Sequence, residues 1–296
     1  MYFAIRHTTR FTYDRPVFLE PHTLRLQPRG DGVQRLLRFA AEIDPRPAGS
    51  SQCVELDGNT ALRLWFEGEH RALTFSTEAE VETAARNPFD FFLEPGALQL
   101  PLRCGDGLAA LLGPHRTPLS PAGEVADLAG RLAHQAGGNT LAFLSALNTH
   151  IHQACTQSFR PEGDPLAPEQ TWSQRQGACR DLTVLFMQAC RCQGIAARFV
   201  SGYQADAPEE ERHDLHAWAE VYLPGAGWRG YDPTQGLSVV DRHVALAAGP
   251  THEQARPTEG TFRGTGAHSQ MEAEISIQTS SAPIQSVKTS PKERAQ

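Results

Sequence analysis

The first hundred residues alternate between apolar and polar positions in the way that predicts β-strands. Leu24 and Leu26 alternate with polar neighbours, and residues 76–83 repeat this pattern. Turn sequences rich in Pro, Gly and Asp, such as residues 28–32, separate the runs. Several short strands with regular turns favour a small sandwich or barrel, so we predict a β-rich, sandwich-like N-terminal domain over residues 1–100.

A stretch rich in proline and glycine follows at residues 101–121, and its composition predicts a linker to a second domain. Apolar residues then recur at helical spacing over residues 122–135. A second amphipathic helix is expected to begin near Asn139 or Thr140, either of which can cap its first turn. Helical periodicity therefore replaces strand periodicity after the linker.

The third predicted helix begins close to Cys179, and Gly194 stands where a left-handed C-terminal cap is expected. Strand periodicity then returns in three segments, which are residues 195–203, 216–223 and 228–232. Helices followed by a largely antiparallel sheet predict an α+β second domain. We place this core at residues 122–278, with residues 271–278 as one more strand. The Ser-, Thr-, Pro- and Lys-rich residues 279–296 are predicted to be a disordered tail.

The composition describes a globular chain. Apolar residues make up 40% and charged residues 21% of the 296 residues, which is enough to build a buried core. The formal net charge is -7, so nucleic acid is not expected as a partner. No apolar run approaches the ~20 residues of a membrane span, and the N-terminus lacks the pattern of a secretion signal. We therefore expect a cytoplasmic protein with no membrane partner.

The six cysteines do not suggest the dense disulfide framework of short secreted domains. Cys190 and Cys192 have no second cysteine pair at zinc-finger spacing, so we expect no metal. Glycine patterns typical of dinucleotide-binding and P-loop proteins are absent, so we expect no nucleotide cofactor. The oligomeric state is left open.

Cys179 is the candidate nucleophile, because a glycine precedes it closely and an apolar-faced helix follows it. A thiol at a helix N-terminus lies near the positive end of the helix dipole, which lowers its pKa and favours the thiolate. Unpaired N–H groups of the first turn can also stabilise a developing oxyanion. The alternative is a small buried core residue, which is the interpretation we keep for Cys190 and Cys192.

A thiol nucleophile needs a base, and His216 is the strongest candidate among the 12 histidines. It opens a strictly alternating segment in which His216, Trp218 and Glu220 share one face. Asp232, at the end of the next strand, is the candidate that would hold the imidazole in the correct tautomer. Both residues also have simpler interpretations, as an exposed histidine and as the turn residue before Pro233.

The register between these two strands decides whether the side chains meet. A plain hairpin that pairs Leu223 with Trp228 places Asp232 on the face away from His216. A bulge, for which Gly230 is the candidate, or a shifted register is needed to bring the carboxylate to the imidazole.

Three blocks of sequence resemble the core of the transglutaminase-like superfamily, in that family's order. They are Gly177-x-Cys179-Arg180-Asp181, His216-Ala217-Trp218-x-Glu220-Val221 and Tyr231-Asp232-Pro233-Thr234. Four further blocks resemble the region that precedes this core in bacterial transglutaminase-like proteins. They are Ile5-x-His7-x-Thr9-x-Phe11-x-Tyr13, Pro16-Val17, His22-x-Leu24-Arg25-Leu26-x-Pro28-Arg29 and Asn87-Pro88-Phe89-Asp90. The combination is more specific than any single block.

The resemblance implies a papain-like α+β core, in which helices pack on a mainly antiparallel sheet. It also implies that Cys179 is the nucleophile, His216 the base and Asp232 the residue that orients the base. It does not identify the side chains that bind the oxyanion or the substrate, for which the candidates are Gln170, Trp172, Gln174 and Trp218.

The implied reaction is cysteine-dependent acyl transfer or hydrolysis of a protein or peptide amide through a thioester. An amine or water would resolve the acyl-enzyme, and because the same three residues serve both outcomes, the sequence leaves them open. A cysteine peptidase or amidase without transferase activity is one alternative. The other is a non-catalytic binding module, against which the presence of Cys179, His216 and Asp232 counts.

Overall fold

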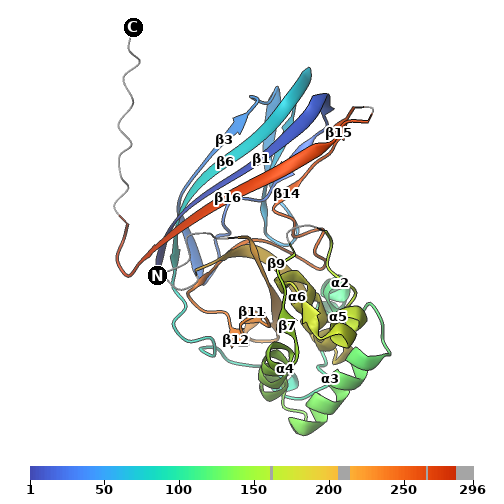
Figure 1. Ribbon diagram of the computed structural model, residues 1–296. Coiled ribbons are helices and arrows are strands. Elements are labelled where there is room, and N and C mark those ends of the chain that lie inside the picture. Colours follow the sequence, from blue (N-terminus) through green and yellow to red (C-terminus); the bar gives the residue numbers. More distant parts are fainter. Residues whose placement is uncertain (161–162, 206–213, 265, 285–296) are drawn as a thin grey trace.

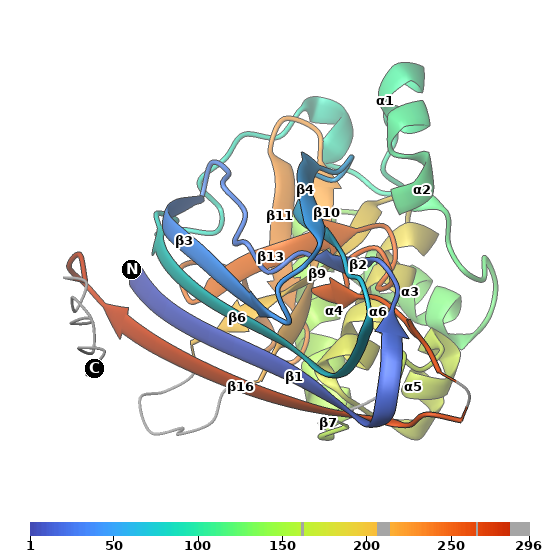
Figure 2. The same ribbon diagram turned by 90° about the horizontal axis from the view of Figure 1, so that it is seen from above.

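The computed structural model describes residues 1–160, 163–205, 214–264 and 266–284, and it begins with long antiparallel strands (Figure 1). The first sheet has the order β15-β1-β6-β3, and β16 also pairs with β1. Figure 2 shows β3, β6, β1 and β16 side by side. The strands are β1 (Tyr2–Leu19), β3 (Gln34–Asp44), β6 (Glu69–Thr83), β15 (Phe262–Arg263) and β16 (Ser269–Ser280).

A second antiparallel sheet packs against the first and completes the predicted sandwich. Its order is β14-β2-β5-β4. The strands are β2 (His22–Leu24), β4 (Gly49–Val54), β5 (Thr60–Trp65) and β14 (Thr258–Glu259). Phe3 and Phe75 of the first sheet and Leu24 and Leu64 of the second are buried in one cluster. The alternation read from the sequence is therefore the alternation of inward and outward side chains.

The final strand belongs to this sandwich, which corrects its predicted place in the core of residues 122–278. β16 runs antiparallel to β1 over its whole length, from Tyr2 paired with Ser280 to Tyr13 paired with Ser269. Ile275 is buried in the sandwich core, so apolar packing holds the strand there. Of the predicted tail, residues 279–280 continue β16, and residues 285–296 lie outside the described residues.

The core contains the three predicted helices, α3 (Glu124–Gln135), α4 (Thr140–Ala154) and α6 (Cys179–Cys192). Asn139 caps α4 by accepting a hydrogen bond from the Ala142 backbone N–H at 2.9 Å. Shorter helices were not predicted: η1 (Pro95–Ala97), α1 (Asp106–Leu111), α2 (Gly113–Arg116) and α5 (Pro168–Gln174). Two of them lie in the predicted linker, where Leu102 is buried in the core. This segment therefore packs on the core instead of spanning open space.

A five-stranded antiparallel sheet with the order β12-β11-β10-β9-β13 completes the core, so the predicted α+β class is confirmed. The strands are β9 (Ala196–Gln204), β10 (His216–Leu223), β11 (Gly227–Asp232), β12 (Leu237–Ser238) and β13 (His243–Gly249). A short parallel pair, β7 (Thr156–Gln157) with β8 (Gln176–Gly177), precedes α6. Helix α6 packs against β10, whose Ala217, Ala219 and Val221 share its apolar cluster. Within the described ranges, no helix has both the length and the apolar character needed to cross a membrane.

Gly202, in the middle of the core sheet, gives a test of this packing. A Cβ added there would lie 2.2 Å from the Val244 carbonyl oxygen and 2.6 Å from the Trp218 ring. We expect Gly202→Ala to lower the free energy of unfolding by at least about 1–3 kcal/mol, the usual cost of overpacking. Gly130→Ala in α3 is the control, because an added Cβ there would meet no atom within 4 Å apart from the helix's own backbone, and it should be neutral or stabilising by up to about 1 kcal/mol. Equal stability of the two variants in urea unfolding would contradict this packing.

Candidate active site

Cys179 is the first residue of α6, as the sequence predicted, and its backbone is held by a buried carboxylate. Asp181 is fully buried, and its Oδ2 accepts a hydrogen bond from the Ala178 backbone N–H at 2.8 Å. Gly177 allows this close approach, because a Cβ there would lie 2.8 Å from the Asp181 Cβ. The Gly-x-Cys-Arg-Asp block therefore encodes a helix start with a fixed geometry.

Asp181 also ties the helix start to the segment that precedes α5. Its Oδ1 accepts hydrogen bonds from the Arg160 guanidinium at 2.6 Å and from the Leu166 backbone N–H at 2.8 Å. Sequence analysis did not assign a role to this residue. An acidic side chain three residues after a helix N-cap is the signal that pointed to it.

His216 and Asp232 meet because the hairpin register is shifted by one residue. Tyr222, and not Leu223, is paired with Trp228, and Ala219 is paired with Tyr231. Since side chains alternate along a strand, this shift moves Asp232 to the face of His216, and no bulge at Gly230 is needed. The His216 Nε2 atom lies 2.7 Å from the Asp232 Oδ2 atom.

Asp232 is fully buried and is surrounded by hydrogen-bond donors. Its Oδ1 accepts from the backbone N–H groups of Thr234 at 2.9 Å and Gln235 at 3.3 Å, while Oδ2 accepts from His216 and from His243 Nε2 at 3.0 Å. Burial alone would raise the pKa of Asp232, but the hydrogen bonds from the two imidazoles hold it well below its usual range. The carboxylate is therefore ionised at neutral pH.

His243 was not predicted as a site residue. It opens β13, a strand that the sequence analysis missed, in Asp241-Arg242-His243. The run His243–Gly249 is short and wholly buried, so its strand signal is an uninterrupted apolar stretch and not an alternation. Contact between His243 and Asp232 depends on a sheet pairing that local sequence does not reveal.

The Cys179 thiol lies near the His216 imidazole and the Ala217 backbone N–H, and both groups act to lower the pKa of the thiol. Burial acts to raise the thiol pKa, yet these two contacts and the imidazole charge lower it overall. For His216, burial acts to lower the pKa, but the contacts with Asp232 and Cys179 raise it to about 10. Both shifts favour a thiolate beside an imidazolium at neutral pH.

Three donor atoms, from His216, Asp232 and His243, lie within 4.8 Å of one another, which is close enough for a metal site. Both imidazole Nε2 atoms, however, face the same carboxylate oxygen, which can only accept hydrogen bonds. These nitrogens therefore carry protons and do not offer lone pairs. The group is a hydrogen-bond network in this arrangement.

Three of the four candidate substrate residues lie on α5, and the fourth, Trp218, lies on β10. Gln170 and Gln174 are exposed on α5, and their roles stay predictions. Trp172 is only 4% exposed and contacts both the Arg175 guanidinium and the His150 ring.

The assignment of Trp218 to the substrate is wrong, because this side chain is 1% exposed. Its ring packs against the rings of His216 and His243, at centroid distances of 6.3 and 5.0 Å. The face of β10 that carries Trp218 is covered by other parts of the protein and does not face solvent. This burial depends on tertiary packing, which the alternation along β10 does not reveal. Trp218 supports the imidazoles from within the protein.

A pocket of about 420 Å³ lies along the flank of α6, away from this network. Val184, Met187, Pro168 and Pro250 contribute apolar walls, and Cys179 is not among its lining residues. None of Cys179, His216, Asp232 and His243 lines this pocket.

Family models match two parts of the chain. The bacterial transglutaminase-like N-terminal region matches residues 3–82, and the transglutaminase-like superfamily matches residues 127–233. The second match includes Cys179, His216 and Asp232 and supports cysteine-based catalysis in general.

Two mycobacterial relatives cover nearly the whole chain. An uncharacterized protein of Mycobacterium tuberculosis is 24% identical over 289 residues, which are 93% of this chain and 92% of that protein. An uncharacterized protein of Mycobacterium leprae is 24% identical over 271 residues, or 88% and 93% of the two chains. The crystal structure of a "Putative Cysteine Protease" from Cytophaga hutchinsonii matches with a TM-score of 0.67 and 19% identity, covering 98% of this chain and 95% of that one. This likeness shows a shared fold.

The pKa shifts predict that iodoacetamide labels Cys179 before the other helix cysteines. Burial raises the pKa of Cys190 well above its ordinary value and also raises that of Cys192, whereas the pKa of Cys179 is lowered. A thiol with a lowered pKa is more fully ionised at pH values below the ordinary cysteine pKa. Labelling of Cys179 should therefore persist below about pH 8.5. Peptide mapping of labelled protein across pH measures this, with His216→Gln as the variant in which the preference should weaken. Faster labelling of Cys190 than of Cys179 would show that the site is wrongly assigned.

Proposed function

We propose that this chain, which belongs to the transglutaminase-like superfamily, catalyses acyl transfer or hydrolysis at an amide through a thioester on Cys179. The observation that carries the proposal is the 2.7 Å hydrogen bond between His216 Nε2 and Asp232 Oδ2, in an imidazole close enough to Cys179 for each group to shift the pKa of the other. A nucleophile, a base and a residue that orients the base are the parts that covalent amide chemistry requires.

The resting state in this mechanism is the thiolate–imidazolium pair. Its support is the lowered pKa of Cys179 together with the His216 pKa of about 10. The thiolate attacks the amide carbonyl carbon, and the carbonyl π-bond breaks to give an oxyanion. The proposed stabilisers of that charge are backbone N–H groups at the start of α6, because the first N–H groups of a helix generally lack a partner within it.

Collapse of the tetrahedral intermediate breaks the carbon–nitrogen bond. The His216 imidazolium gives its proton to the departing nitrogen, so ammonia or an amine leaves and a thioester to Cys179 remains. The neutral imidazole then takes a proton from the incoming amine or water, which attacks the thioester and restores the thiolate. Asp232 keeps the proton on Nε2 throughout, because its oxygen accepts from that nitrogen at 2.7 Å.

The acyl donor is proposed to be a carboxamide or peptide bond in a protein or peptide. A cysteine peptidase or amidase without transferase activity uses the same machinery, and the name of the Cytophaga hutchinsonii protein favours testing it as the second candidate. The two functions differ only in what resolves the thioester.

Replacement of Cys179 tests the shared first half of the reaction. We expect Cys179→Ala and Cys179→Ser to abolish turnover of peptide amides, because no thioester can form, while the free energy of unfolding changes by no more than about 1–2 kcal/mol. Mass spectrometry of the wild type incubated with substrate should find the acyl group on Cys179. Cys53→Ser, at a partly exposed cysteine outside the core, is the matched control and should keep full activity. Undiminished turnover in Cys179→Ala would exclude the proposal.

The fate of the thioester separates transfer from hydrolysis. We expect added primary amines to increase release of the leaving group and to appear in the product, because an amine resolves a thioester faster than water where both reach it. Product analysis with and without glycine ethyl ester measures this partition. Exclusive formation of free acid at every amine concentration would assign the protein as a peptidase or amidase.

A further inference from the structure

Asp232 receives a second histidine on the oxygen that orients the base. His243 Nε2 lies 3.0 Å from Asp232 Oδ2, and His216 Nε2 lies 2.7 Å from the same atom. The His243 side chain is 7% exposed, and its Nδ1 atom has no hydrogen-bond partner among the described residues. The strongest contact of this buried imidazole is therefore with the carboxylate.

On the basis of the proposed function, we propose that His243 is a positioning residue, which the N-terminal region holds against Asp232 through strand β13. Its N–H fixes the rotamer of the carboxylate and helps to keep it charged. His243 acts through Asp232 and His216 and does not touch the reacting atoms.

The packing around the ring leaves it little freedom. Trp218 meets His243 edge to face at 5.0 Å and 71°, and the His216 ring lies at 6.0 Å. Among the described residues, Asp232 on β11 forms a hydrogen bond with the His243 ring and His216 on β10 forms a ring contact with it, and both of these side chains are titratable. A rigid donor of this kind can hold a carboxylate in one orientation without moving to solvent.

The strand that carries His243 is held by two amide side chains from the N-terminal region. β13 is an outer strand of the core sheet, so one edge of its backbone faces away from β9. Gln34 binds both backbone groups of Ala245, accepting from the N–H at 2.7 Å and donating to the oxygen at 3.0 Å. Asn59 does the same at Ala248, with both distances at 2.8 Å.

The two contacts match an irregularity in β13. Alternate residues of a regular strand face the same edge, so the outward groups would be two residues apart. The register between β13 and β9 shifts between Ala245 and Ala247, and the two outward residues are Ala245 and Ala248, three apart. The bulge thus fits the spacing of Gln34 and Asn59.

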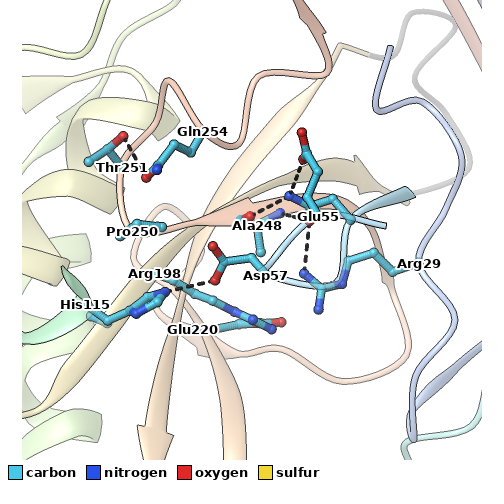
Figure 3. Close-up of polar contacts among 12 residues, drawn as sticks. Arg29, Glu55, Asp57, His115, Arg198, Glu220, Ala248, Pro250, Thr251 and Gln254 are labelled. Atoms are coloured by element: carbon cyan, nitrogen blue, oxygen red, sulfur yellow. Dashed lines mark hydrogen bonds and ion pairs between the residues drawn. The ribbon is translucent and has the colours of Figure 1, made fainter. Parts of the chain in front are cut away.

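Further contacts fix the amides themselves. The Gln34 side chain also donates to the Arg29 oxygen at 2.7 Å. Asn59 follows the turn between β4 and β5, where its amide donates to Glu55 at 3.3 Å. Figure 3 shows Glu55, from this turn, beside Ala248 of β13. The inferred route therefore runs from the sandwich through β13 to His243 and Asp232, which gives the N-terminal region a role in the reaction.

Two substitutions at His243 separate a donor from a space-filling side chain. His243→Leu keeps the volume and removes the N–H, whereas His243→Gln places an amide donor near the position of Nε2. We expect His243→Leu to lower kcat/KM about 10- to 100-fold, as for loss of a hydrogen bond to a charged group, with KM changed less than kcat. We expect His243→Gln to stay within about threefold of the wild type, and His268→Leu, at an exposed histidine, to be unchanged.

The pH dependence of Cys179 labelling by iodoacetamide gives a readout that a purely structural role would not move. A buried carboxylate that loses a donor holds its proton to higher pH, and a protonated Asp232 no longer favours the imidazolium. The acid limb of labelling should therefore move upward by about half a pH unit or more in His243→Leu and stay in place in His243→Gln. A folded His243→Leu protein with the wild-type profile, or a downward shift, would overturn the inference.

A remote variant decides the question if His243→Leu does not fold. The double variant Gln34→Ala/Asn59→Ala leaves His243 in place and removes both side chains that hydrogen-bond to the backbone of β13. An upward shift of the acid limb supports the route from the N-terminal region, and a wild-type profile overturns it. If His216→Gln leaves the labelling of Cys179 as in the wild type, the proposed function itself fails. This result differs from failure of the inference alone, in which His216→Gln weakens labelling but the variants at His243, Gln34 and Asn59 keep the wild-type profile.

Discussion

A carboxylate without access to water, Asp232, is the group around which the core is arranged. A buried charge is unfavourable unless nearby donors replace its hydration. Asp232 obtains two donors from the turn that follows β11 and two from the imidazoles of β10 and β13. The turn after β11, the register of the β10–β11 hairpin and the outer strand β13 must therefore all be in place for the four donors to reach Asp232. Order in the site thus depends on order in the sheet.

A second buried carboxylate, Asp181, gives the nucleophile the same kind of support. It binds the backbone just before Cys179, the Arg160 guanidinium and the Leu166 N–H. One carboxylate thus fixes the helix start and the other fixes the base. With both partners held, the sulfur and the imidazole meet without reorganisation, and fixed geometry of this kind is a large part of how enzymes lower barriers.

The sandwich and the core are joined by more than the chain that connects them. The last strand, β16, returns to β1, and β14 and β15 return to the two sheets of the sandwich. The core is therefore inserted between the first and last strands of the sandwich. The side-chain amides of Gln34 and Asn59 in the sandwich region form hydrogen bonds with the backbone of β13 in the core. The N-terminal region thus helps to hold the strand that carries His243.

The sequence by itself determined the local features: the alternation in the sandwich, the start of α6 at Cys179, and the three blocks that contain Cys179, His216 and Asp232. These depend on periodicity, on caps and on neighbours within a few positions. Tertiary structure alone decided the one-residue register shift, the return of β16 to the sandwich, the burial of Trp218 and the contact of His243 with Asp232. Each of these joins residues that the chain brings together only through sheet pairing and layer packing, whose free energy is not contained in any short segment.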